Sequence, residues 1–124
     1  MNVASLENCK ELFELSGWTD VDLSGWTKDE YPEHNKGTFV STSPIYGKSF
    51  TYLCPAYDLG YLLRKLPSGY QLNLDTTMSG SRIYWFENFA GDGAPQQTST
   101  PEDAAAKLAI ELFKQNILRP EGKE

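Results

Sequence analysis

The residues best suited to catalysis are few and lie far apart along the chain. His34 is the only histidine, and it lies in a polar turn at residues 32–37, where a solvated loop histidine is more common than a general base. Cys54 precedes a proline, and no base is spaced to activate it as a nucleophile. We therefore predict no catalytic residues and expect that the protein is not an enzyme.

Carboxylates are the other group dense enough to bind a ligand. Five of them lie between positions 20 and 33: Asp20, Asp22, Asp29, Glu30 and Glu33. Their spacing does not match a calcium-binding loop, which alternates acidic ligands and then turns at a glycine. The glycine pair at residues 91–93 lacks the strand-to-helix context of a phosphate-binding loop. We expect no metal and no cofactor.

The same acidic segment is better suited to binding a partner. Trp18, Trp26 and Tyr31 lie among its carboxylates. Carboxylates spaced like backbone phosphates can occupy a cationic nucleic-acid channel on another protein, and aromatic side chains can anchor such a contact. The alternative is a solvated acidic surface whose tryptophans point into the core. Exposed tryptophans would favour the first interpretation, and buried ones the second.

The charge distribution agrees with a role for the N-terminal third. The 124-residue chain has 17 acidic and 11 basic side chains, a net charge of −6. Residues 1–34 hold eight acidic and two basic side chains, whereas the rest of the chain holds nine of each. This balance argues against direct binding of nucleic acid. Because no signal sequence or long apolar run is present, we expect a cytoplasmic protein that does not bind membranes.

The elements that would position these residues start with a helix capped by Ser5 and ended near Gly17. Its apolar positions follow helical spacing, so Glu7, Glu11 and Glu14 should share its wet face. Gly17 and Gly25 then predict two turns, each presenting a tryptophan. A short strand at 38–41 is the only element expected in the remaining loop-rich part of residues 1–48.

Residues 49–118 carry stronger patterns. A strand at 49–53 should lead into a helix opened by Pro55, followed by a hairpin with strands at 70–75 and 82–89. The last helix, 100–118, should have Thr100 as its cap, and Asp103 should complete a variant capping box. Residues 119–124 look like a loose tail, and Cys9 and Cys54 should remain reduced.

Together these elements predict a single α+β domain over residues 1–124. A small antiparallel sheet of three or four strands would be packed between helices, in the order α-(β)-β-α-β-β-α, where the bracketed strand is 38–41. Residues 1–48 would form an acidic helix and loop-rich segment beside the 49–118 core.

Three features of the chain resemble small phage and prophage proteins of the phage α-β-α sandwich type. They are the pattern at 55–63, the hairpin with Trp85, and the segment Thr100-Pro101-Glu102-Asp103 with its alanine-rich continuation. The resemblance covers about residues 49–118 and implies an intracellular protein encoded by a mobile element. It brings no catalytic residues that could be mapped onto this chain.

These observations lead to one main hypothesis. The protein would be a non-enzymatic phage protein that binds a host macromolecule through its acidic surface. It would inhibit a host defence system by mimicking nucleic acid, as anti-CRISPR proteins do. The eight acidic and aromatic residues named above would form the contact. The alternatives are a protein that binds or sequesters a small ligand such as a nucleotide, using the aromatic hairpin and the loop at 90–99, or a phage protein of another role.

Overall fold

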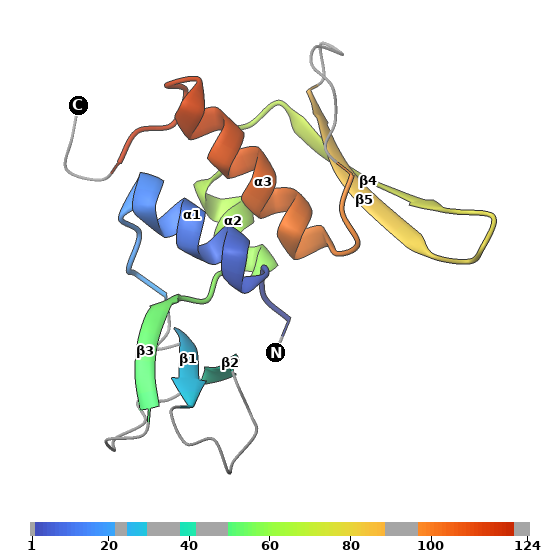
Figure 1. Ribbon diagram of the computed structural model, residues 1–124. Coiled ribbons are helices and arrows are strands. Elements are labelled where there is room, and N and C mark those ends of the chain that lie inside the picture. The colour runs from blue at the N-terminus through green and yellow to red at the C-terminus, as the bar shows by residue number, and fades with distance from the viewer. Residues whose placement is uncertain (1, 22–24, 30–37, 42–49, 89–96, 121–124) are drawn as a thin grey trace.

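The computed structural model describes residues 2–21, 25–29, 38–41, 50–88 and 97–120, and it confirms the α+β class. Three helices lie together in the centre, with one sheet at one end and a projecting hairpin at another side (Figure 1). The elements in chain order are α1 (Leu6–Ser16), β1 (Gly25–Asp29), β2 (Thr38–Ser41), β3 (Phe50–Pro55), α2 (Leu59–Lys65), β4 (Tyr70–Thr76), β5 (Arg82–Asn88) and α3 (Pro101–Lys114).

The strands form two separate antiparallel sheets where one was expected. Among the described residues, the first sheet has the order β2-β1-β3, and the second pairs β4 with β5. An antiparallel sheet of three strands is therefore present as predicted, but the hairpin does not join it, because β3 pairs with β1. Strand β1 itself was not predicted, whereas the short strand at 38–41 is confirmed as β2.

Gly25 explains why β1 was missed. A glycine usually weakens a strand, yet here Gly25 pairs with Ser41 on one side and Pro55 on the other. The ring of Tyr52 on β3 covers it so closely that a Cβ at Gly25 would lie 2.2 Å from the ring carbon Cε2. The predicted turn at Gly25 is therefore wrong, because the missing side chain makes room for an aromatic ring from the neighbouring strand.

The caps of α1 and α3 form as the sequence predicts. The Ser5 hydroxyl accepts a hydrogen bond from the Asn8 backbone N–H, and Gly17 ends α1 in the left-handed conformation at φ 68°. The Thr100 hydroxyl accepts from the Asp103 N–H at 3.1 Å. The Asp103 carboxylate does not complete a capping box: its Oδ1 accepts from the Ser5 N–H at 2.7 Å and from Asn8 Nδ2 at 2.8 Å, which ties α3 to α1.

Helix α2 begins later than expected. Strand β3 continues through Pro55, and Asp58 caps the helix by accepting from the Tyr61 N–H at 2.7 Å. Proline 55 therefore ends a strand and does not open the helix. On this helix Tyr61 and Leu62 are buried, whereas Leu63 is exposed.

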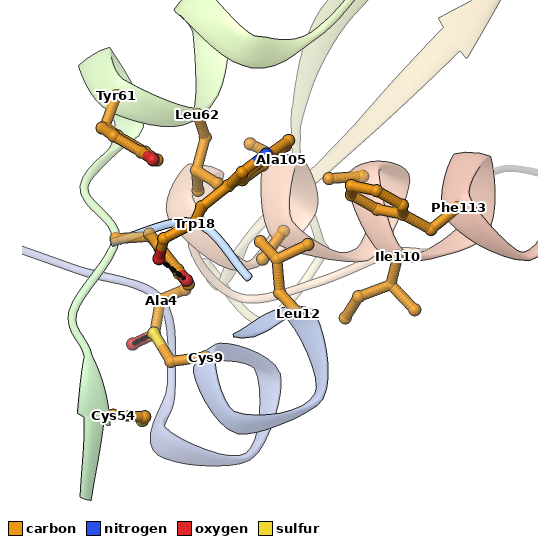
Figure 2. Packing of buried hydrophobic residues seen from close by; sticks show 13 residues of the cluster. Ala4, Cys9, Leu12, Trp18, Cys54, Tyr61, Leu62, Ala105, Ile110 and Phe113 are labelled. Carbon is orange, nitrogen blue, oxygen red and sulfur yellow. Dashed lines mark hydrogen bonds between the residues drawn. The ribbon is translucent and has the colours of Figure 1, made fainter. Parts of the chain in front are cut away.

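One hydrophobic cluster joins the three helices to β3 and to the segment after α1 (Figure 2). Three fully buried alanines of α3 (Ala105, Ala106 and Ala109) leave space for side chains from the other two helices. Cys9 and Cys54 lie at its edge toward β3 and are both free thiols, as predicted.

Candidate partner-binding surface

The structure describes the side chains of three of the eight predicted contact residues: Trp18, Asp20 and Trp26. Asp29 is described only as the last residue of β1. The other four, Asp22, Glu30, Tyr31 and Glu33, lie outside the described residues, as does His34.

Trp18 is a core residue. Its exposure is 3%, and its ring makes edge-on contacts with Phe113, Tyr61 and Tyr57 at centroid distances of 5.2, 6.1 and 6.4 Å. The Tyr57 hydroxyl donates a hydrogen bond to the Trp18 carbonyl at 2.7 Å. Edge-on aromatic contacts of this kind stabilise a core beyond the area that they bury. The prediction of Trp18 as a surface anchor is therefore wrong, and at this residue the structure favours the alternative, a tryptophan that points into the core.

Trp26 lies between core and surface. Its side chain is half-buried against the hydrophobic cluster, and its Nε1 donates to the Ala4 carbonyl at 3.3 Å. Because the polar edge of the indole is engaged within the protein, only part of its ring can contact a partner. Of the two tryptophans, Trp26 is the one with exposed side-chain surface that a partner can contact.

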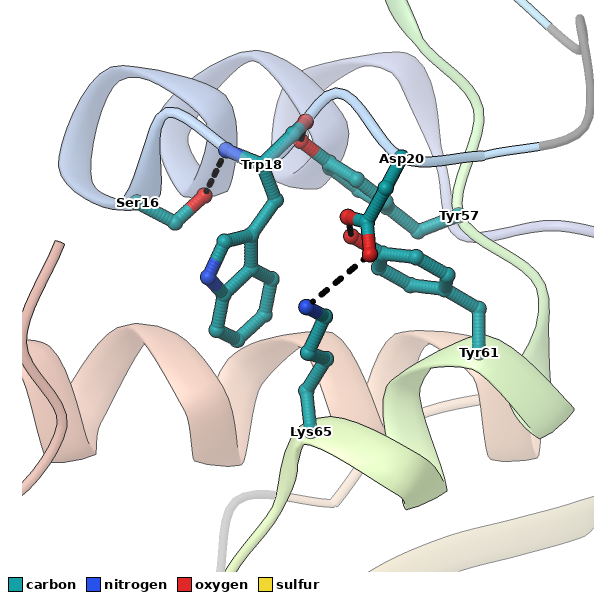
Figure 3. Close-up of polar contacts among 6 residues, drawn as sticks. All are labelled: Ser16, Trp18, Asp20, Tyr57, Tyr61 and Lys65. Carbon is teal, nitrogen blue, oxygen red and sulfur yellow. Dashed lines mark hydrogen bonds and ion pairs between the residues drawn. The ribbon is translucent and has the colours of Figure 1, made fainter. Parts of the chain in front are cut away.

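Asp20 is held in place on the surface (Figure 3). Its side chain is 59% exposed, and its two oxygens accept hydrogen bonds from the Tyr61 hydroxyl and from Lys65 Nζ, the latter at 3.2 Å. The hydrogen bond from Tyr61, followed by that from Lys65, lowers the pKa of the Asp20 carboxyl below its ordinary value. Asp20 is therefore a fixed, ionised carboxylate.

Lys65 connects this carboxylate to the core aromatics. Its ammonium lies 5.4 Å from the ring centroids of both Trp18 and Tyr61, within the range of cation–π attraction. Tyr61 and Lys65 were not predicted as site residues, although their i, i+4 spacing places them on one face of a helix. Nothing in the sequence indicated that this face would meet the segment after α1.

Helix α1 adds the other described carboxylates of the acidic third. Glu7, Glu11 and Glu14 are all exposed, which confirms the predicted wet face. Glu11 forms an ion pair with Lys114 of α3 at 3.3 Å, where both side chains are about half exposed. Exposed pairs of this kind contribute little to stability, so the carboxylate remains available to a partner. We call Glu7, Glu11, Glu14 and Asp20 the described acidic residues.

Neither a metal-binding group nor an activated thiol lies among the described residues. Within the parts of the chain that the structure describes, no three histidine, cysteine or acidic side chains lie together in a group that could hold a metal ion. Burial raises the pKa of the Cys54 thiol to about 12, and it also raises that of Cys9, so neither thiol is prepared to act as a nucleophile. Among the described helices, none is long and apolar enough to span a bilayer.

Comparison with protein-family models, curated proteins and solved structures finds no match to this chain.

Proposed function

We propose that the protein is a non-enzymatic binding protein whose acidic N-terminal third docks on a cationic surface of another macromolecule. The observation that carries the proposal is the concentration of charge: the net −6 resides in residues 1–34, and α1 presents its three glutamates to solvent while burying Cys9 and Leu12. A one-sided charge distribution accelerates and orients association with an oppositely charged partner.

The nature of the partner follows from the sequence pattern. A series of carboxylates on one segment imitates the phosphates of a nucleic-acid backbone, so we propose a nucleic-acid-binding protein of a bacterial host as the target. The resemblance to small phage proteins supports a component of a defence system. Asp20 suits this role, since its orientation is already fixed and little conformational entropy is lost when a partner binds.

The test is capture from bacterial lysate on the immobilised protein. In one variant, amides replace Asp20, Asp22, Asp29, Glu30 and Glu33. In a matched control, amides replace five acids elsewhere: Asp75, Glu87, Asp92, Glu121 and Glu124. We expect a captured protein that is released by salt and by duplex nucleic acid, lost in the first variant and retained by the control.

Equal capture by both variants, with circular dichroism showing that both are folded, would contradict the proposal. The small-ligand alternative would then be examined through its own prediction. It requires nucleotides to be released from the purified protein on denaturation, which mass spectrometry detects.

A further inference from the structure

The outer edge of β4 is unpaired in the described part of the chain. Strand β4 has one neighbour, β5, in a two-stranded sheet. The outer edge of β5 is different, because Tyr84 exchanges two backbone hydrogen bonds of 2.8 Å with Thr98. The hairpin extends away from the three helices, with its turn as the far end (Figure 1). Two strands alone are marginally stable in water, so a further strand would stabilise this hairpin.

The bridge at Tyr84 reveals which backbone groups of β4 face outward. Tyr84 uses its N–H and C=O for Thr98, so it cannot exchange them with Leu74, the residue opposite. The pairing from Tyr70–Asn88 to Thr76–Arg82 has no register shift, and antiparallel pairs alternate between bonded and non-bonded. The backbone groups of every second β4 residue therefore point away from β5: those of Tyr70, Leu72, Leu74 and Thr76.

The side chains of this edge are apolar on one face of the hairpin. Leu72 lies opposite Phe86, which packs against the hydrophobic cluster, and Leu74 lies opposite Tyr84. Leu74 is nevertheless 55% exposed. Helix α3 packs against β5, so the apolar row that begins at the core stops unfinished at Leu74.

We propose that β4 pairs edge to edge with β4 of a second copy of this chain, antiparallel and with Asn73 on the two-fold axis. A two-fold interface must be self-complementary, and only pairings between outward-facing residues form backbone hydrogen bonds. Centring the axis on Asn73 lets all seven residues of β4 overlap. Leu72 then pairs with Leu74 of the second copy, and Tyr70 pairs with its Thr76.

This register completes the apolar row on both copies. Across the joined sheet, each row of the apolar face runs from Tyr84 and Leu74 of one copy to Leu72 and Phe86 of the second copy. The two-fold axis generates a second row with the same residues. Each Leu74 gains an apolar neighbour on its open side, which removes its exposed surface from water. The four-stranded sheet would run from the core of one copy to the core of the other.

The polar face of the edge fits the same register. The Asn73 Nδ2 atom is buried and has no hydrogen-bond partner in the structure. The second copy places its own Asn73 directly opposite, in the closely spaced kind of pair, where the two side-chain amides can bond to each other once they turn from their buried positions toward the edge. Asp75, the only charged residue of β4, faces Gln71 of the second copy, so no like charges oppose each other.

The expected affinity is modest. Thr76 already donates its outward N–H to the Asp75 carboxylate at 2.8 Å, which leaves the ends of the strand less available. A single strand edge buries less area than a standard interface, and interfaces of that size are weak. We expect a dissociation constant of about 10–100 μM.

Sedimentation of the full chain over a range of concentrations tests for the dimer. We expect native protein to shift from monomer to dimer with rising concentration, and Leu74→Lys to weaken this association at least about tenfold, since it places a charge in the apolar row. Met78→Lys is the matched control: Met78 is fully exposed in the hairpin turn, beyond the paired residues, and should dimerise as the native protein does. A monomer at every concentration, or equal loss in both variants, would overturn the proposal.

Cross-linking tests the register. Asn73→Cys should form a disulfide-linked dimer on mild oxidation, because residues facing each other across the axis lie within disulfide range, with Cα atoms about 4.5 Å apart. Asp75→Cys is the control. Position 75 faces position 71 of the second copy, so the two introduced cysteines would lie four residues apart along the strand, beyond disulfide range. Equal cross-linking of both variants, or none at position 73 in protein that sediments as a dimer, would overturn this register. Native Cys9 and Cys54 are buried and do not compete.

Discussion

At the scale of single residues, Asp20 combines exposure with a fixed orientation. Surface carboxylates usually move freely, but this one is bound by the Tyr61 hydroxyl and the Lys65 ammonium, and Lys65 in turn lies over the Trp18 ring. The acidic segment is therefore joined to the core at one of its carboxylates. The sequence showed the charge of Asp20 but not its partners, because they lie 41 and 45 residues away.

The lowered pKa of Asp20 predicts how pH affects stability. In the unfolded chain an aspartate titrates near pH 3.9, whereas the folded pKa is lower, so the unfolded state binds the proton first. The stabilising contribution is complete above about pH 5 and is lost as the pH falls through the folded pKa. Urea unfolding of native protein and Asp20→Asn should therefore differ at pH 7, and the difference should shrink as the pH falls below about 5.

Tyr61→Phe provides the matched test, because it removes the largest cause of the pKa shift and keeps the ring in the core. In that background, Asp20→Asn should have a smaller effect at pH 7 than in the native protein. An undiminished effect would mean that the hydroxyl of Tyr61 does not hold the carboxylate.

The two cysteines provide a second prediction at this scale. Cys9 and Cys54 are 0% and 1% exposed, and burial raises both thiol pKa values. Iodoacetamide at pH 8 should leave both unmodified in the folded protein and modify both in urea, as measured by intact mass. Met78→Cys is the control, since its exposed thiol should react at once. Rapid modification of a native cysteine would contradict the packing described here.

At the scale of elements, local signals predicted both ends of α1 and the start of α3, whereas tertiary contacts decided the strands. The caps at Ser5, Gly17 and Thr100 depend on neighbours within a few residues, so the sequence contains their full physical cause. Strand β1 depends on partners from β2 and β3 and on the Tyr52 ring over Gly25, and none of these is adjacent in the sequence. The burial of Trp18 has the same kind of cause.

The link between α1 and α3 predicts a specific loss of stability. Asp103→Ala should lower the free energy of unfolding by about 2 kcal/mol, because it leaves the Ser5 N–H and the Asn8 amide without their charged acceptor. Asp103→Asn keeps an acceptor oxygen at the same position and should cost less. Urea unfolding followed by circular dichroism measures both, and an alanine variant as stable as the native protein would show that the link is dispensable.

At the scale of the whole molecule, one core joins the two parts of the predicted single domain. The loop-rich segment 1–48 was expected to lie beside the 49–118 core, and Leu12, Trp18, Leu62 and Ile110 belong to one cluster. The α+β class could be inferred from element types. The division into two sheets on either side of the helices could not, since that depends on which strand edges meet.

A shared core predicts cooperative unfolding. Near-ultraviolet circular dichroism, which reports the packing of the aromatic side chains, Trp18 among them, should change at the same urea concentration as the far-ultraviolet signal of the helices. Leu12→Ala should shift both transitions together, at a cost of about 2–5 kcal/mol, because Leu12 is fully buried. Transitions that separate would show that the helices and the tryptophan belong to different folding units.

The hydrogen bond between Ser5 and Asp103 also has a consequence for biosynthesis. These residues are 98 positions apart, and synthesis proceeds at about 5–20 residues per second. Roughly 5–20 s therefore pass between the synthesis of Ser5 and that of Asp103. Ala105, Ala106 and Ala109, against which the earlier helices pack, are made later still. The apolar side of α1 therefore lacks its final cover during most of translation, and exposed apolar surface of this kind is what chaperones protect from aggregation.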